Sequence, residues 1–135
     1  MAIKFSGVTA LISVFDMPTS VAFYRDVIGF EIIMQSQPGE HFDWALLQRG
    51  GATLMLNTIY EAADRPAAVD LARQAGHEDT ILYFDCNDLD EAYEYLRSKG
   101  VAAKKPVVRP YGMRQLSLSD PDGYGLCFQH RVNAG

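Results

Sequence analysis

A spacing of 72 residues recurs along this chain, and it constrains the fold more than any other feature of the sequence. Asp16 and Asp88 lie 72 positions apart, and each stands before a stretch in which apolar residues recur at helical spacing. Gly51 and Gly123 repeat the same offset later in each copy. One offset shared by helix starts and turns predicts that the 135 residues form two copies of a single structural unit.

The clearest turn is the sequence Asp120-Pro121-Asp122-Gly123 in the second copy. Proline presets φ for the second position of such a turn, the aspartates cap it locally, and glycine adopts a positive φ without steric cost. Leucine and phenylalanine alternate with small or polar residues on both sides of the turn. This pattern predicts a hairpin of half-buried strands.

Each copy has the pattern of one strand, one helix and three further strands. Gly29 and Gly100 are expected to end the two helices. In the first copy we expect strands at 8–14, 30–35, 42–49 and 52–57 and a helix at 18–28. In the second copy we expect strands at 80–85, 103–108, 114–119 and 125–130, with a helix after the first strand. The sequence therefore predicts an α+β fold of two βαβββ modules, at about 7–57 and 80–130, within a single domain spanning 1–135.

The segment 58–79 connects the two modules. Pro66 is typical of a first helical turn and Gly76 of a helix end, so these residues predict a short helix over 67–75. We interpret the segment as a connector that could also cover a binding site.

Charge and composition bear on the class of partner. The net charge of −5 and the isoelectric point near 5.0 argue against nucleic acid and anionic membranes, and they favour neutral or cationic small molecules. No apolar run approaches the roughly 20 residues needed to span a bilayer. Two cysteines do not make a disulfide framework, so we expect the protein in a reducing cytoplasm.

The run Asp16–Phe30 and the turn Asp120–Gly123 together resemble the vicinal oxygen chelate superfamily. That superfamily includes glyoxalase I, extradiol dioxygenases, fosfomycin-resistance enzymes and bleomycin-resistance proteins. The stretches Trp44–Gly50 and Asp88–Tyr93 are similar to the bleomycin-resistance branch. The resemblance covers nearly the whole chain and implies paired modules whose cupped mixed sheets surround a cavity, usually in a homodimer.

The resemblance also implies where a metal would be held. Enzymes of the superfamily bind a divalent metal with His, Glu or Gln side chains on four strands, two in each module. In this chain the first-strand positions fall at Thr9 and Ile81, and the last-strand positions fall at Met55 and Cys127. Hard octahedral metals prefer oxygen and imidazole ligands, whereas these residues offer a hydroxyl, an alkyl group, a thioether and a thiol. We therefore expect no metal and no other cofactor.

Histidine and cysteine chemistry offers no substitute site. His41, His77 and His130 are expected to be solvated side chains of loops and of the C-terminal tail. The repeat places no histidine base beside Cys127, so we expect a buried and unreactive thiol there.

Aromatic and polar residues supply the candidates for ligand contact. In bleomycin-resistance proteins, aromatic side chains of the corresponding regions stack on the flat rings of the drug, which by resemblance implicates Tyr111 and Trp44. Alternation along its strand groups Trp44 with Phe42 and Leu46, and extrapolating the repeat places this group toward the helices, so ligand contact and packing both stay open for Trp44. For Arg114, the alternative interpretation is a charged side chain on the protein surface or at an interface. The expected ligand-binding residues are Thr9, Leu11, Trp44, Met55, Asn57, Ile81, Asp85, Tyr111, Arg114 and Cys127.

Three functional interpretations remain. We favour a metal-free protein that sequesters an aromatic or amphipathic small molecule, as in antibiotic resistance. An enzyme of the superfamily, a lyase or dioxygenase with displaced metal ligands, is the alternative. A homodimer whose cavity has lost any ligand is the third. In each case we expect a homodimer, because a cupped sheet of this size exposes strand edges and apolar rims.

Overall fold

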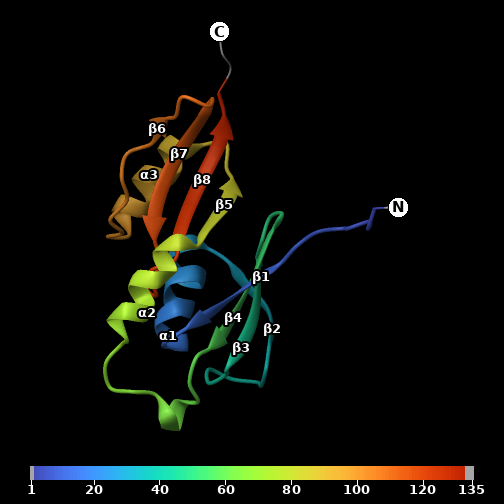
Figure 1. The fold of residues 1–135 in the computed structure, drawn as a ribbon, viewed down its shortest axis with the longest axis vertical. Helices are drawn as coiled ribbons and strands as arrows, with labels where there is room; N and C mark the ends of the chain where they lie inside the picture. Colours follow the sequence, from blue (N-terminus) through green and yellow to red (C-terminus); the bar gives the residue numbers. More distant parts are fainter. Residues whose placement is uncertain (1, 133–135) are drawn as a thin grey trace. The chain divides into compact units, whose positions relative to one another are not determined.

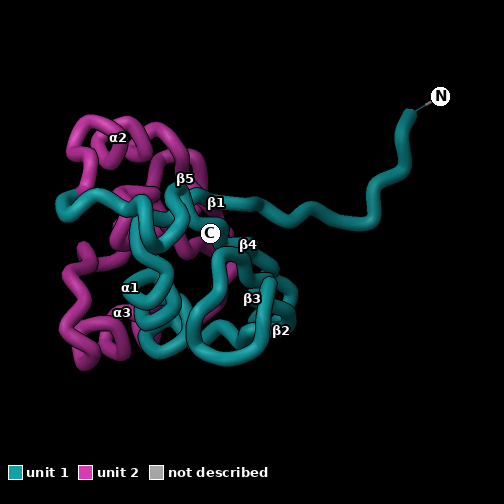
Figure 2. Tube along the Cα trace, turned by 90° about the horizontal axis from the view of Figure 1, so that it is seen from below, with its two compact units in different colours: residues 1–68 teal, residues 69–135 magenta. Residues whose placement is uncertain are grey.

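The computed structural model describes residues 2–132 of the chain (Figure 1). The chain divides into two compact units, residues 1–68 and residues 69–135, which Figure 2 draws in different colours. Each unit holds one four-stranded mixed sheet, and the predicted α+β fold of two βαβββ modules is confirmed. Among the residues described, no helix is long and apolar enough to cross a membrane.

Unit 1 follows the predicted order of elements. Its sheet has the order β1-β4-β3-β2, with β1 parallel to β4 and the other neighbours antiparallel. The elements are β1 (Ala10–Val14), α1 (Met17–Val21), the π-helical stretch η1 (Ala22–Ile28), β2 (Glu31–Gln35), β3 (Trp44–Arg49), β4 (Ala52–Thr58) and the 3-10 turn η2 (Ala62–Asp64).

The helix of unit 1 begins and ends where the sequence predicts. The side chain of Asp16 caps it by accepting a hydrogen bond from the backbone N–H of Thr19 at 3.3 Å. Gly29 ends it with a φ of 105°, a conformation that favours glycine. The helix predicted over 18–28 is present, but its second part, Ala22–Ile28, is π-helical. Apolar spacing alone does not distinguish an α-helix from a π-helical stretch.

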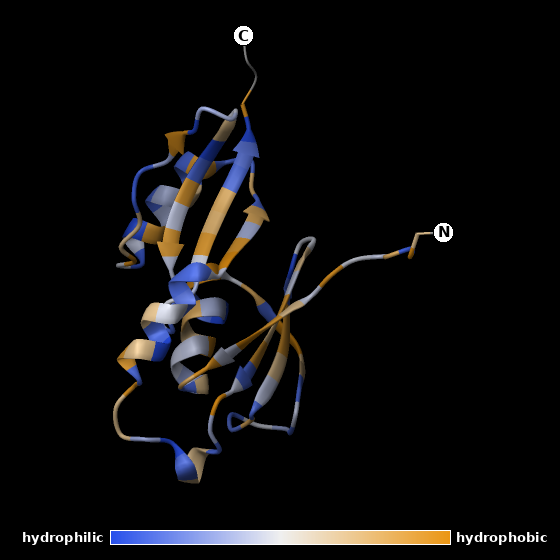
Figure 3. Cartoon of the chain, viewed as in Figure 1, coloured by the Kyte–Doolittle hydropathy of each residue, from blue (hydrophilic) through white to orange (hydrophobic). Residues whose placement is uncertain are grey.

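The core of unit 1 lies between its helix and one face of its sheet. Burial alternates along β1, β3 and β4, as expected for a sheet with one packed face, although hydrophobic residues lie on both faces of these strands (Figure 3). Tyr24 of the helical segment is fully buried. The buried strand residues are Ile12, Val14, Ala45, Leu47, Leu54 and Leu56.

Unit 2 repeats this arrangement. Its sheet has the order β5-β8-β7-β6, with β5 parallel to β8, and Asp88 caps its helix by accepting a hydrogen bond from the N–H of Glu91 at 3.0 Å. The elements are α2 (Leu71–Gly76), the 3-10 turn η3 (His77–Asp79), β5 (Ile81–Asp85), α3 (Leu89–Ser98), β6 (Val107–Val108), β7 (Met113–Ser119) and β8 (Gly125–Arg131). The strand predicted at 103–108 is therefore present only at its last two residues.

The turn between β7 and β8 forms as predicted. The Oδ1 atom of Asp120 accepts hydrogen bonds from the N–H groups of Asp122 at 2.8 Å and Tyr124 at 2.9 Å. Gly123 has a φ of +89°. A Cβ at this position would lie 2.5 Å from the carbonyl oxygen of Gln74, so glycine also permits the close approach of α2 to the turn.

The connector differs from its prediction. The helix expected over 67–75 begins instead at Leu71, because the side chain of Asp70 caps it by accepting from the N–H of Ala72 at 3.1 Å. The solvated loop position expected for His77 is also wrong. Its ring stacks on Tyr124, with centroids 4.0 Å apart, and its Nδ1 lies 2.7 Å from the carbonyl oxygen of Asp122. The second part of the connector is thus a packed element of unit 2.

Candidate functional site

Each sheet has one face packed on the helix of its own unit and a second face that this helix does not cover. We call the second face the open face of that unit. On the open face of unit 1, Leu11 of β1 and Leu46 of β3 both pair with Met55 of β4. Leu11 is 49% exposed, whereas the neighbouring Leu54 and Leu56 of the opposite face are buried. The open face of unit 1 therefore presents apolar side chains to solvent.

Trp44 belongs to this open face, so of the two alternatives left open by the sequence, packing toward the helix is wrong. Trp44 pairs directly with Asn57, whose strand neighbour Leu56 has no exposed surface. The alternation of Trp44 with Leu46 holds, but the repeat is one residue shorter on this strand: Trp44 corresponds to Gln115, 71 positions later, whereas its partner Asn57 corresponds to Gln129, 72 positions later. The structure thus brings Trp44 and Asn57 together with the aliphatic row formed by Leu11, Leu46 and Met55.

Thr9 lies just before β1 and is exposed. Its Oγ1 is 2.6 Å from the Oγ1 of Thr53 on β4. Thr9 therefore borders the open face of unit 1 at the end opposite Trp44 and Asn57.

On the open face of unit 2, Tyr83 of β5 and Ser117 of β7 both pair with Cys127 of β8. Ile81 lies two residues before Tyr83 on the same face, and the two side chains are 48% and 56% exposed. Cys127 itself is buried between its neighbours. The structure thus brings the predicted residues Ile81 and Cys127 onto one face. Tyr83, which was not predicted as a site residue, lies next to both.

A row of hydrogen-bonded polar side chains crosses the same face beside Asp85. Gln129, the register partner of Asp85, accepts a hydrogen bond from Nε2 of Gln115 at 2.9 Å. The Oε1 atom of Gln115 in turn accepts from the Tyr111 hydroxyl at 3.1 Å and from Nε of Arg109 at 3.4 Å. Gln115 is only 6% exposed, so these bonds satisfy a buried amide and hold the Tyr111 ring at the edge of the face.

Sequence reasoning missed Gln129 and Gln115. The first could have been found, because Gln129 stands 72 positions after Asn57, which was a candidate. Gln115 gives no such signal. Its counterpart in unit 1 is Trp44, because Trp44 pairs with Asn57 as Gln115 pairs with Gln129, and a tryptophan does not point to a glutamine.

Arg114 is the one predicted residue that the structure turns away from the open faces. It pairs with His130 on β8, next to Leu116 on the buried side, and its guanidinium forms an ion pair of 2.7 Å with Asp90 of α3. The hydrogen bond from Arg114 lowers the pKa of the Asp90 carboxyl. Arg114 therefore links the sheet of unit 2 to its helix.

The four positions that correspond to metal ligands do not fit a divalent metal. Thr9 is engaged with Thr53, and Met55 and Ile81 carry no hard donor atom. Burial raises the pKa of the Cys127 thiol, which disfavours the thiolate that would bind a metal, although a hydrogen bond with Ser117 acts in the opposite direction. Within residues 2–132, no three His, Cys, Asp or Glu side chains are grouped so that they could hold a metal ion.

Solved structures share this fold over almost the whole chain. TnmS3, an antibiotic binding protein from Streptomyces sp. CB03234, is 27% identical with a TM-score of 0.65, covering 98% of this chain and 99% of its own. A glyoxalase/bleomycin resistance protein from the same organism is 26% identical with a TM-score of 0.62, covering 90% and 97%. A bleomycin resistance determinant encoded on the transposon Tn5 is 23% identical with a TM-score of 0.70, covering 94% and 98%, and shows likeness of fold.

None of the curated proteins matches this sequence. The profile of one protein family matches residues 8–128, which include both sheets almost completely. The chain belongs to the Glyoxalase/Bleomycin resistance protein/Dioxygenase superfamily.

Proposed function

We propose that this protein is a metal-free binding protein that sequesters an aromatic or amphipathic small molecule on its open sheet faces and does not convert it. The observation that carries the proposal is the pairing of Trp44 and Asn57 beside the aliphatic row of Leu11, Leu46 and Met55. Ligand sites are mostly apolar surfaces with a few polar groups that orient the ligand, and this face has that composition.

The open face of unit 1 offers a flat contact for a ring. Trp44 can stack on a planar group, and an aromatic pair contributes about 0.5–1.5 kcal/mol beyond the burial of apolar area. The amide of Asn57 lies directly across from it and can donate and accept hydrogen bonds at the rim of the same ring. Together these groups select a ligand that is flat and carries polar substituents.

The open face of unit 2, considered by itself, is a surface of similar character. The exposed rings of Tyr83 and Tyr111 provide aromatic surface, and Ile81 adds apolar area. The carboxylate of Asp85 stands beside Gln129 on this face and favours a positively charged substituent on the ligand. The apolar and aromatic surface of both faces supports an amphipathic ligand.

An antibiotic is the ligand class that the comparisons support. TnmS3, a binding protein for antibiotics, is 27% identical to this chain over nearly its full length. We propose that the compound bound here belongs to the aromatic antibiotics and that binding confers resistance by lowering the free concentration of the drug.

We also propose that the 135 residues act as one functional domain within a homodimer. Exposed apolar side chains support the homodimer, because monomeric proteins rarely leave such groups contiguous and uncovered. In unit 1 they include Ile33, Met34 and, before β1, Ile3 and Phe5. Both cysteines are free, which supports the reducing cytoplasm as the location.

A panel of aromatic antibiotics, with bleomycin among them, tests the proposed function by thermal shift. A compound present at 100 times its Kd stabilises the folded state by about 2.7 kcal/mol, which raises the melting temperature measurably. Recovered compound should be unchanged after prolonged incubation. A compound that is consumed with turnover would contradict the proposal, as would a panel in which no aromatic compound raises the melting temperature.

A further inference from the structure

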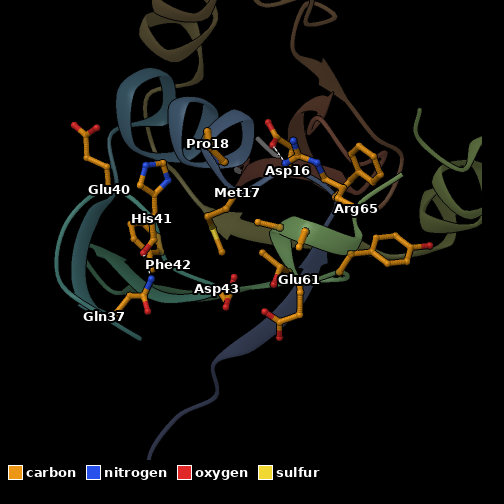
Figure 4. Close-up of a pocket in the computed structure, with 15 residues that line it drawn as sticks. Asp16, Met17, Pro18, Gln37, Glu40, His41, Phe42, Asp43, Glu61 and Arg65 are labelled. Atoms are coloured by element: carbon orange, nitrogen blue, oxygen red, sulfur yellow. Dashed lines mark hydrogen bonds and ion pairs between the residues drawn. The ribbon is translucent and has the colours of Figure 1, made fainter. Parts of the chain in front are cut away.

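Unit 1 contains a hollow of about 520 Å³ that does not lie on its open face. Three segments surround it: the start of α1, the loop between β2 and β3, and the chain that follows β4 (Figure 4). Its inner wall includes Met17 and Phe42, which are buried and belong to the helix side of the unit. The hollow is therefore separate from the face that carries Trp44 and Asn57.

The loop between β2 and β3 is held in place by its own side chains. The Nε2 atom of Gln35 donates to the carbonyl oxygens of Gln37 at 2.7 Å and Gly39 at 2.8 Å, and the amide of Gln37 donates to the carbonyl oxygen of His41. Asp43 is fixed at the end of this loop, because its N–H donates to Oγ of Ser36 at 3.0 Å. This wall of the hollow is formed before any ligand arrives.

The opposite wall is held by an ion pair. Arg65, which follows η2, pairs with the carboxylate of Asp16 at the start of α1, and its guanidinium lies 5.7 Å from the ring centroid of Phe15. The Phe15 ring meets that of Tyr60 edge to face at 6.4 Å. These contacts tie the segment after β4 to the helix start, and they place two aromatic rings at the hollow.

The charges around the hollow are unbalanced. Four carboxylates line it, those of Asp16, Glu40, Asp43 and Glu61, against the single guanidinium of Arg65, which Asp16 already engages. Within the described part of the chain, neither Asp43 nor Glu61 takes part in an ion pair with Lys, Arg or His. An anionic ligand is disfavoured here, whereas a cation gains from carboxylates contributed by two different walls.

We propose that this hollow is a second binding site, separate from the open faces, that takes a small organic cation with an apolar or aromatic body. The ammonium group lies between the carboxylates of Asp43 and Glu61, and the apolar body rests against Met17 and Phe42. The aromatic rings at the hollow suit such a ligand, because a cation near an aromatic face is attracted by the ring quadrupole. A volume of about 520 Å³ falls within the range of small-molecule sites and accommodates a phenylalkylamine.

Calorimetric titration with 2-phenylethylamine, which is protonated at pH 7, tests this site. We expect binding to wild-type protein, and binding weakened about fivefold in Asp43→Asn and in Glu61→Gln, the effect of one charge at about 4 Å in water. Glu94→Gln removes an exposed carboxylate from unit 2 and serves as the control for a change of net charge, with binding unchanged within twofold. The neutral analogue 2-phenylethanol should bind at least fivefold more weakly than the amine.

Amide chemical shifts locate the site without relying on variants. The amine should shift the resonances of residues 40–43 and 60–63 and leave those of Tyr83 and Cys127 in place. Shifts confined to the open faces would overturn the proposal. So would an equal loss of binding in Glu94→Gln, equal binding of the alcohol, or the absence of heat on titration into wild-type protein.

Discussion

Trp44 on β3 and Asn57 on β4 lie directly opposite each other, on the face of the unit 1 sheet that its helix does not cover. The pair combines an aromatic ring with an amide next to the partly exposed side chains of Leu46 and Met55. This arrangement is suited to a flat ligand with polar substituents, and it is the basis of the binding function proposed above.

Trp44 is the only tryptophan of the chain, so its fluorescence reports directly on this face. A ligand that stacks on the ring should quench or shift the emission with a saturable dependence on ligand concentration. We expect Trp44→Ala to weaken binding about fivefold to tenfold, because an aromatic pair contributes about 0.5–1.5 kcal/mol in addition to its buried area. Emission that stays constant while a ligand binds elsewhere would contradict the role given to this residue.

Tyr111 offers a second test on unit 2. Its side chain is 66% exposed and donates to Gln115, so Tyr111→Ala should weaken ligand binding while changing the free energy of unfolding by less than about 1 kcal/mol. Tyr111→Phe keeps the ring and should retain most of the affinity. Urea unfolding and fluorescence titration of the two variants measure both effects. A large loss of stability in Tyr111→Ala with unchanged affinity would assign the residue a purely structural role.

Gly123→Ala should destabilise the protein more than its positive φ alone requires. The new Cβ would meet the carbonyl oxygen of Gln74 at 2.5 Å, in addition to the cost of a φ of +89°. Gly112→Ala is the matched control, since Gly112 has a φ of +83° and a Cβ added there would meet no atom within 4 Å. We expect a loss of about 1–2 kcal/mol for the control and a clearly larger loss for Gly123→Ala in urea unfolding.

Equal losses in the two glycine variants would show that α2 does not pack closely on the turn. The stacking of His77 on Tyr124 would then contribute little to the attachment of this helix.

The two thiols should differ in reactivity. Cys127 is buried and its pKa is raised by burial, whereas Cys86 is partly exposed. A disulfide reagent at pH 8 should therefore label about one thiol rapidly in the native protein, and Cys86→Ser should abolish that fast phase. Because the folded-state pKa of Cys127 lies above its unfolded value, its stabilising contribution is complete below about pH 8.5 and is lost as the pH rises through the folded-state pKa. Rapid labelling of Cys127 in the Cys86→Ser variant would contradict this account.

The sequence was most informative where local chemistry decides the structure. Asp16 and Asp88 cap their helices, and the turn at Asp120–Gly123 forms, because each depends on hydrogen bonds between near neighbours in the chain. The offset of 72 residues was sufficient to predict the two modules because it repeats these local signals.

It was less informative where a contact joins distant residues. The face of Trp44 depends on the register between β3 and β4, and the repeat is 71 residues on β3 instead of 72. The orientation of Arg114 depends on Asp90, which is 24 positions away in the chain. The hydrogen-bonded chain from Tyr111 through Gln115 to Gln129 joins three segments, so the alternation within a single strand does not indicate it.

Native mass spectrometry of the purified protein, mixed with aromatic antibiotics including bleomycin, tests whether the open faces bind such a compound without converting it. We expect a complex whose mass equals the protein plus the unmodified compound, on a dimer that carries no metal. Trp44→Ala and Tyr111→Ala should lower the fraction of complex at equal ligand concentration. A compound released with altered mass, or a fraction of complex unaffected by both substitutions, would contradict the claim that the open faces bind the ligand without converting it.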